Sequence, residues 1–344
     1  MDTLVNIEEL PLFFILGRPR SGTTMLRSMF DAHPSVIIPP EFPMLATVEN
    51  LPQDNWNNNT IAEFILRIQK IRKFENLKIS AKQIEAALKQ YLAENKTLNI
   101  QTAFKITNSL FESPFEKKEI FAIGDKNPLY SLYIKRLRKI FPDAKFVFIQ
   151  RHLFSVLDSV YKTNFLLHWP SVVALQWKRA YKQAMDEINV NPTNSKIIKY
   201  EDLVLNTRFY LEDICKFIAI PYDENMMKFN EEKLLSKVYG DNLYTAHSSL
   251  LKDVSGTKLP KWEKVSKTRY KIALAWSGNS IKRAGYYPVN CRFKWMYWLF
   301  GLPHCFFNMG FNIATGILRF LTGKKFNGSF QMYLAVHLYG KTKS

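Results

Sequence analysis

The feature that most constrains the fold is a short apolar run that leads into a glycine-containing loop. Leu12 to Leu16 is predicted to be a buried strand, and Thr23 to Phe30 carries apolar residues at helical spacing. Between them runs Gly17-Arg18-Pro19-Arg20-Ser21-Gly22-Thr23-Thr24. Glycines let the backbone curl so that its N–H groups face an anion, and the following helix presents its positive end to that anion. The segment therefore predicts a strand, an anion-binding loop and a helix.

The loop lacks the lysine that nucleoside triphosphatases use. Thr23 stands in that position, and a second predicted strand, Lys145 to Gln150, ends in Gln150-Arg151 rather than in a carboxylate for Mg²⁺. A P-loop kinase or NTPase is therefore disfavoured. Glu201 and Asp202, which follow a third predicted strand at Lys196 to Tyr200, keep this alternative open.

Strands that alternate with helices indicate parallel βαβ units. Helices are predicted at 133–140, 155–161, 175–188 and 208–218, and 60–95 carries two apolar stripes at helical spacing. We expect an α/β, P-loop-like fold of three layers, in which helices flank a central parallel sheet. The main domain should span 1–290 with a helical insertion at about 45–118, followed by an extension at 291–344 with an apolar helical segment. Ligands are expected at the carboxyl ends of the strands.

Composition narrows the partners and the compartment. The 344-residue chain carries a net charge of +18, which attracts polyanions such as nucleotides, acidic lipid headgroups or nucleic acid. No nucleic-acid motif accompanies this charge, so nucleic acid ranks last. Cys215, Cys291 and Cys305 lie far apart without ligand spacing, so neither a disulfide framework nor a metal site is expected. The first ten residues do not read as a signal peptide, and we expect a cytoplasmic protein.

Pro11 to Pro34 resembles the 5′-phosphosulfate loop of the superfamily of sulfotransferases that use 3′-phosphoadenosine-5′-phosphosulfate (PAPS), in the style of tyrosylprotein sulfotransferases and their bacterial relatives. Further elements follow in the family's order. Gly124 to Pro128 resembles the lysine element, and Lys145 to Arg151 with Ser159 resembles the 3′-phosphate motif. The chain reads Arg151-His152-Leu153 where the family has Arg-Asp-Pro. Tyr200 to Leu203 resembles the family's Tyr-Glu-Asp-Leu segment, to which we assign a mostly structural role. Ser255 to Trp262 resembles its C-terminal lid.

The resemblance implies sulfuryl transfer from PAPS to a hydroxyl or amine acceptor, with adenosine 3′,5′-bisphosphate as product and without a metal. It assigns donor binding to Arg20, Ser21, Gly22, Thr23, Thr24, Arg151, Ser159, Lys258 and Lys261. It assigns catalysis to Glu41 as general base, to Lys126 at the leaving nucleotide and to Arg20. The alternatives for the base are His33, His152 and His168. The identity of the acceptor stays open. The alternative function is that of a non-catalytic basic protein that binds membranes.

The C-terminal extension has an aromatic stretch with basic flanks. Between Lys294 and Arg319 no charged residue occurs, and Arg292 and Lys325 lie outside this stretch. Aromatic and basic flanks suit a membrane interface, whereas Pro303 and several polar residues interrupt the apolar run. Three interpretations stay open. Residues 291–325 could dock on the inner face of a membrane, form a packing arm or a homodimer contact, or span the membrane. Docking would favour a lipid or carbohydrate acceptor.

Overall fold

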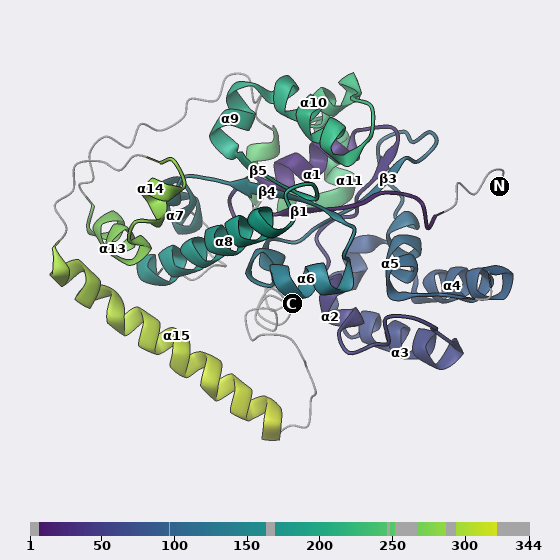
Figure 1. The fold of residues 1–344 in the computed structure, drawn as a ribbon, viewed down its shortest axis with the longest axis horizontal. Helices are drawn as coiled ribbons and strands as arrows, with labels where there is room; N and C mark the ends of the chain where they lie inside the picture. Colours follow the sequence, from purple (N-terminus) through teal and green to yellow (C-terminus); the bar gives the residue numbers. More distant parts are fainter. Residues whose placement is uncertain are drawn as a thin grey trace.

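Five parallel strands form the central sheet of the computed structural model, which describes residues 7–95, 97–162, 169–245, 248–251, 267–286 and 294–321. Their order across the sheet is β2-β3-β1-β4-β5 (Figure 1). The strands are β1 (Leu12–Leu16), β2 (Val36–Ile37), β3 (Ala122–Lys126), β4 (Lys145–Gln150) and β5 (Ser195–Lys199). The prediction of a central parallel sheet is confirmed.

Strand β1 lies at the centre and pairs with β3 on one side and β4 on the other. Ile15 lies opposite Lys126, and Leu16 lies opposite Phe148. The chain leaves β1 toward one edge of the sheet, returns through β3 and then crosses to β4. Such a reversal leaves a crevice at the carboxyl end of the central strand, where ligands bind in open α/β sheets. The predicted loop starts at this point.

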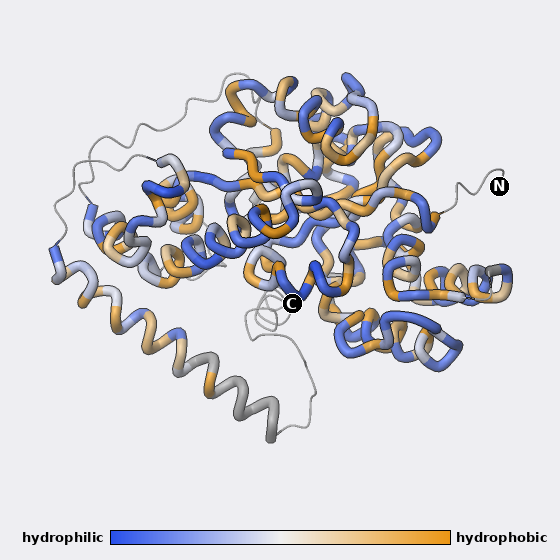
Figure 2. The backbone as a smooth tube through the Cα atoms, in the orientation of Figure 1, coloured by the Kyte–Doolittle hydropathy of each residue, from blue (hydrophilic) through white to orange (hydrophobic). Residues whose placement is uncertain are grey.

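Side chains alternate along β1 and build a separate core on each face of the sheet. Phe13 and Ile15 pack with α1 (Thr23–Asp31), α10 (Thr207–Ile218) and α11 (Glu232–Tyr239). Phe14 and Leu16 pack with α5 (Ile100–Ser109), α6 (Ile134–Ile140) and α8 (Pro170–Val190). The strands are coloured as largely hydrophobic between these helices (Figure 2). These layers confirm the predicted three-layer arrangement.

The insertion between β2 and β3 is helical, as predicted. It holds α2 (Met44–Val48), α3 (Asn58–Gln69), the 3₁₀ segment η1 (Arg72–Leu77), α4 (Ala81–Asn95) and α5. Asn57 starts α3 because its side chain accepts hydrogen bonds from the backbone N–H groups of Asn59 and Thr60. The two apolar stripes at 60–95 therefore belong to two helices that η1 separates.

Strand β3 was not predicted as a strand, because Asp125 and Lys126 interrupt its apolar pattern. All five of its residues are nevertheless buried, since β3 lies between β1 and β2. Gly124 faces the ring of Phe13, and a Cβ atom at this glycine would lie 2.6 Å from Phe13 Cζ. The glycine thus makes room for a core aromatic side chain.

The remaining elements complete the second half of the chain. They are η2 (Pro128–Leu132), α7 (Leu153–Tyr161), α9 (Tyr200–Leu205), η3 (Glu224–Lys228), α12 (Asn242–Thr245), η4 (Ser248–Leu251), α13 (Thr268–Ser277), α14 (Ser280–Arg283) and α15 (Trp295–Leu321). Helices α7, α8, α13 and α14 share a third apolar cluster. Helix α15 runs along the outside of the molecule from its contact with α13 (Figure 1). Within the described ranges, no helix combines the length and the apolar character that a membrane crossing requires.

Candidate active site

The loop between β1 and α1 leads into backbone N–H groups at the start of α1 that are available to an anion. Ser21 N donates to the carbonyl oxygen of Arg18 at 3.1 Å, and Gly22 adopts a left-handed conformation with φ 95°. The first helical hydrogen bond runs from Leu26 N to Gly22 O, so the N–H groups of the first turn have no acceptor within the helix. No acidic residue lies in this turn. The positive end of α1 is thus free of internal counter-charge.

Both glycines of the loop are required by close neighbours. A Cβ atom at Gly17 would lie 2.5 Å from the carbonyl oxygen of Ile149, and one at Gly22 would lie 2.4 Å from Cδ2 of Tyr200. Tyr200 follows β5, so the loop packs against the ends of two other strands. This tyrosine was not predicted to belong to the site.

Arg151 and Ser159 reach the loop from β4 and α7, as the sequence analysis expected. Arg151 Nη1 donates to the carbonyl oxygen of Arg20 at 3.0 Å, and Arg20 Nε donates to Ser159 Oγ at 2.8 Å. The guanidinium carbon of Arg151 lies 4.1 Å from the ring centre of Tyr200, a cation–π contact that orients the side chain. The structure therefore brings the loop and the second motif to one place.

A small, open hollow lies beside the loop and is lined by Arg18, Ser21, Arg151, Trp177 and Tyr181, among others. Burial lowers the pKa of the Arg18 guanidinium to about 10. Arg18 Nη1 and Arg151 Nε are both buried, and neither has a hydrogen-bond partner among the residues that the structure describes. Buried donors without acceptors are costly, so two such guanidinium groups fit an anionic ligand at this loop.

Lys126 and Glu41 meet at the opposite side of the loop. Lys126 Nζ lies 3.2 Å from Glu41 Oε2 and 3.4 Å from Thr24 Oγ1. The Lys126 side chain is 2% exposed and that of Glu41 is 29% exposed, so the carboxylate is the more accessible member of the pair. The end of β3, the segment after β2 and the start of α1 thus place a cation, a carboxylate and a hydroxyl beside the anion loop.

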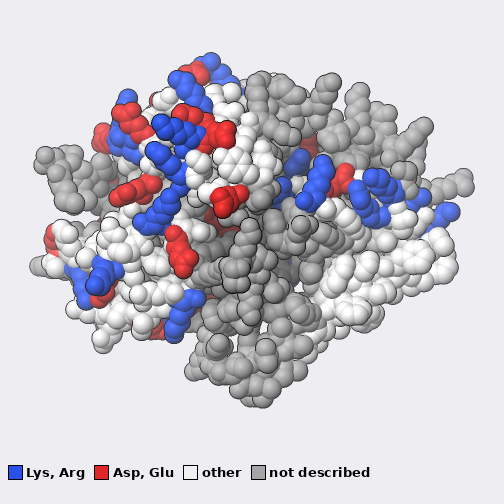
Figure 3. Space-filling model, turned by 180° about the vertical axis from the view of Figure 1, so that it is seen from behind, with Lys and Arg blue, Asp and Glu red and all other residues white. Residues whose placement is uncertain are grey.

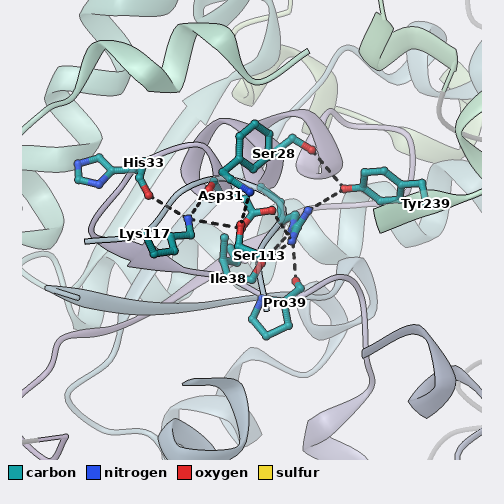
Figure 4. A network of polar contacts seen from close by, with 10 residues as sticks. Ser28, Asp31, His33, Ile38, Pro39, Ser113, Lys117 and Tyr239 are labelled. Atoms are coloured by element: carbon teal, nitrogen blue, oxygen red, sulfur yellow. Dashed lines mark hydrogen bonds and ion pairs between the residues drawn. The ribbon is translucent and has the colours of Figure 1, made fainter. Parts of the chain in front are cut away.

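A buried network of polar contacts joins Asp31 to Ile38 and Pro39, shortly before Glu41 in the sequence (Figure 4). Arg27 Nη2 lies 2.9 Å from Asp31 Oδ2, and both side chains are fully buried. The same guanidinium donates to the carbonyl oxygen of Ile38 at 2.6 Å and to that of Pro39 at 3.3 Å. Because these carbonyl groups closely precede Glu41, helix α1 fixes the backbone that leads to this carboxylate.

Further side chains complete this network. Ser113 Oγ donates to Asp31 Oδ1 at 2.8 Å, and Lys117 Nζ lies 3.7 Å from the same oxygen. Arg27 Nη1 donates to Tyr239 OH at 3.2 Å. The sequence analysis missed these residues. The spacing of Arg27 and Asp31, four residues apart on one helix face, is the signal that could have indicated a pair.

The two described histidines that were alternatives for the base, His33 and His152, have structural roles. Ser35 N donates to His33 Nδ1 at 3.0 Å, which leaves the proton on Nε2 to be donated to the carbonyl oxygen of Pro221 at 2.9 Å. Both ring nitrogens of His33 are thus engaged in tethering the end of α1. His152 Nδ1 accepts from Phe154 N at 3.2 Å, and burial lowers the pKa of this imidazole to about 4. His168, Lys258 and Lys261 lie outside the described residues, as do Cys291, Arg292, Lys324 and Lys325.

Glu201 holds the neighbouring loops together, as the sequence analysis expected. It accepts hydrogen bonds from His152 N at 3.0 Å and from Tyr286 OH at 2.9 Å. Glu201, one of the two carboxylates that kept a Mg²⁺-dependent kinase open as an alternative, therefore has a structural role. In the parts of the chain that the structure describes, no group of three or more acidic, histidine or cysteine side chains could hold a metal ion.

Residues 11–224 match the sulfotransferase family, and this range holds the loop, Glu41, Lys126, Arg151 and Ser159. The chain belongs to the sulfotransferase family. Among its relatives, protein-tyrosine sulfotransferase A of Caenorhabditis elegans is 25% identical over 259 residues, which cover 73% of this chain and 61% of that protein. Protein-tyrosine sulfotransferase 1 of Homo sapiens is 26% identical over 269 residues, which cover 76% of this chain and 65% of that protein. This sulfotransferase chain thus spans less than two thirds of the length of these two relatives.

Solved sulfotransferase structures also resemble the chain. The sulfotransferase domain from the curacin biosynthetic pathway has a TM-score of 0.49 and 19% identity, and the match covers 81% of this chain and 99% of that one. The sulfotransferase domain from the Synechococcus PCC 7002 olefin synthase has a TM-score of 0.47 and 22% identity, with coverage of 73% and 89%.

Loss of the buried charge on Asp31 should destabilise this sulfotransferase. Asp31→Asn leaves the Arg27 guanidinium buried without its counter-ion, and breaking a buried pair in this way costs roughly 3–5 kcal/mol. Urea unfolding followed by circular dichroism should show that loss. Glu85→Gln, which breaks the exposed pair with Lys89, is the matched control and should change stability little. Equal stability of Asp31→Asn and the wild type would contradict the account.

The buried carboxyl of Asp125 should make stability depend on pH. Burial raises its pKa from 3.8 to about 7, so between these values the folded state holds a proton that the unfolded state has lost. Stability should therefore fall as pH rises through this window and level off above it. Relative to Asp125→Asn, the wild type should lose up to about 4 kcal/mol between about pH 4 and pH 8. Parallel pH profiles of unfolding free energy for the two proteins would refute this.

Proposed function

We propose that the chain transfers a sulfuryl group from PAPS to an acceptor hydroxyl and releases adenosine 3′,5′-bisphosphate. The observation that carries the proposal is the pairing of Lys126 with Glu41 at 3.2 Å beside the anion loop, with Thr24 Oγ1 within 3.4 Å of the same ammonium. Such a transfer needs a base, a cation and hydrogen-bond donors for the anion, and here the donors are the amides at the start of α1. Family membership supports the reaction class.

Two sets of donors on either side of the loop suit the two charged ends of the donor nucleotide. Ser21, the amides of Gly22 to Thr24 and the positive end of α1 would hold the 5′-phosphosulfate. Arg151, with a buried Nε that lacks a partner in the described part of the chain, would hold the 3′-phosphate together with Ser159. Bound PAPS supplies the electrophilic sulfur and a good leaving group.

The chain's own residues then act on protons and charge. The Glu41 carboxylate, the exposed member of its pair, would accept the proton of the attacking hydroxyl. Lys126 would stabilise the negative charge that develops on the departing bisphosphate. In the structure these two groups neutralise one another. Binding of the anionic donor near Lys126 would offer the ammonium a second partner and leave the carboxylate oriented toward the acceptor.

The acceptor is proposed only as a class. The relatives are protein-tyrosine sulfotransferases, and the phenolic hydroxyl of tyrosine fits a glutamate base. Alcohols, sugars and lipid hydroxyls would use the same atoms. Labelled PAPS offered to tyrosyl peptides, sugars and lipid extracts would identify the class that accepts the label.

Removal of the proposed base should abolish turnover and leave donor binding intact. Glu41→Gln keeps the shape of the side chain but cannot take a proton, so the transfer rate should fall by about 10²- to 10⁴-fold. Affinity for adenosine 3′,5′-bisphosphate, measured by calorimetry without Mg²⁺, should change little.

The matched control for this test is Glu112→Gln, an exposed carboxylate between α5 and β3, which should transfer like the wild type. Wild-type turnover in Glu41→Gln would show that the base is another group. Mg²⁺-dependent binding of ATP, with no competition by PAPS, would replace the proposal with a kinase.

A further inference from the structure

Helix α15 is attached to the molecule along a narrow face. Ser171 Oγ of α8 donates to the carbonyl oxygen of Gly301 at 3.0 Å, and Trp276 Nε1 of α13 donates to the carbonyl oxygen of Trp298 at 3.0 Å. A Cβ atom at Gly301 would lie 2.0 Å from Trp276 Nε1, so only glycine admits this contact. The backbone of α15 is therefore held against α8 and α13 at one point of its length.

The opposite face of α15 is apolar and exposed. Trp295 is 69% exposed, Phe306 62% and Phe307 72%, and Phe300, Met309 and Ile313 are each more than half exposed. A surface helix of a soluble domain usually turns polar side chains outward. Here the outward face offers large aromatic and aliphatic side chains, and a contiguous apolar surface of this kind marks an interaction site.

The part of the sequence that contains α15 carries charge of one sign. Glu263 is the last acidic residue of the sequence, and thirteen lysines and arginines follow it. Of those in described segments, Lys294 lies exposed immediately before α15, and Lys271 Nζ lies 5.4 Å from the ring centre of Tyr297. The rear view shows uncharged surface on the side where α15 lies, with lysine and arginine side chains and some acidic side chains next to it (Figure 3).

We propose that α15 lies in the interface of an anionic membrane, with its exposed aromatic face among the headgroups. Aromatic rings on a segment whose charged residues are all basic are the chemistry that binds such a surface. The same charges argue against a second copy as the occupant, because a symmetric dimer through α15 would bring two acid-free basic segments together. The inference does not depend on the proposed reaction.

Vesicle binding by the full chain tests the proposal. The protein is sedimented with vesicles of phosphatidylcholine alone or mixed with phosphatidylglycerol. The wild type should bind the mixed vesicles more tightly than the neutral ones, and added salt should weaken this binding. The triple variant Trp295→Ser, Phe306→Ser, Phe307→Ser should lose roughly tenfold or more in partition, because its apolar contacts with the bilayer are gone.

The control replaces exposed apolar residues elsewhere. Leu205→Ser with Phe209→Ser removes two side chains that are 64% and 63% exposed near the start of α10, and it should bind vesicles like the wild type. The triple variant should keep the thermal unfolding midpoint, since the replaced side chains face outward. Equal partition of the triple variant and the wild type would overturn the proposal. It would also fail if light scattering showed a dimer that the triple variant disrupts.

Discussion

The hydrogen bond from Arg151 Nη1 to the carbonyl oxygen of Arg20 joins segments that lie 131 residues apart. It shapes the loop after β1 from the side of β4, and Tyr200 supports it from β5 through its contacts with both Arg151 and Gly22. Parallel pairing of three strands makes this possible, because their carboxyl ends meet at one edge of the sheet. The loop, the arginines beside it and the hollow that they line all depend on the meeting of these strand ends.

The other side of the site depends on charges that are buried for structural reasons. Arg27 and Asp31 pair within α1 and hold the carbonyl groups of Ile38 and Pro39, from which the chain continues to Glu41. A buried pair contributes little net stability, but it tolerates no loss of one partner. One short helix therefore has two roles: its amino end faces the anion, and its side chains fix the backbone that carries the proposed base.

Sequence reasoning found the parts whose signals are local. The glycine frame around Ser21 predicted the anion loop, and the run into Arg151 with Ser159 predicted a second element that the fold brings beside it. It missed β3, because Asp125 and Lys126 are polar yet buried by neighbours that are distant in sequence. It also missed the network around Arg27, since helical charges are ordinarily solvated. The roles of the site residues, the lid with Lys258 and Lys261, and a cytoplasmic location stay predictions.

The central claim is that Arg151 and the loop together hold both charged ends of an adenosine bisphosphate carrier. Calorimetric titration of the wild type and of Arg151→Leu with adenosine 3′,5′-bisphosphate and with adenosine 5′-monophosphate, both without Mg²⁺, tests it most directly. The account predicts that the wild type prefers the bisphosphate and that Arg151→Leu loses this preference, with some loss of monophosphate affinity because the hydrogen bond to Arg20 is also removed. An unchanged preference in the variant, or a wild type that binds neither nucleotide, would contradict it.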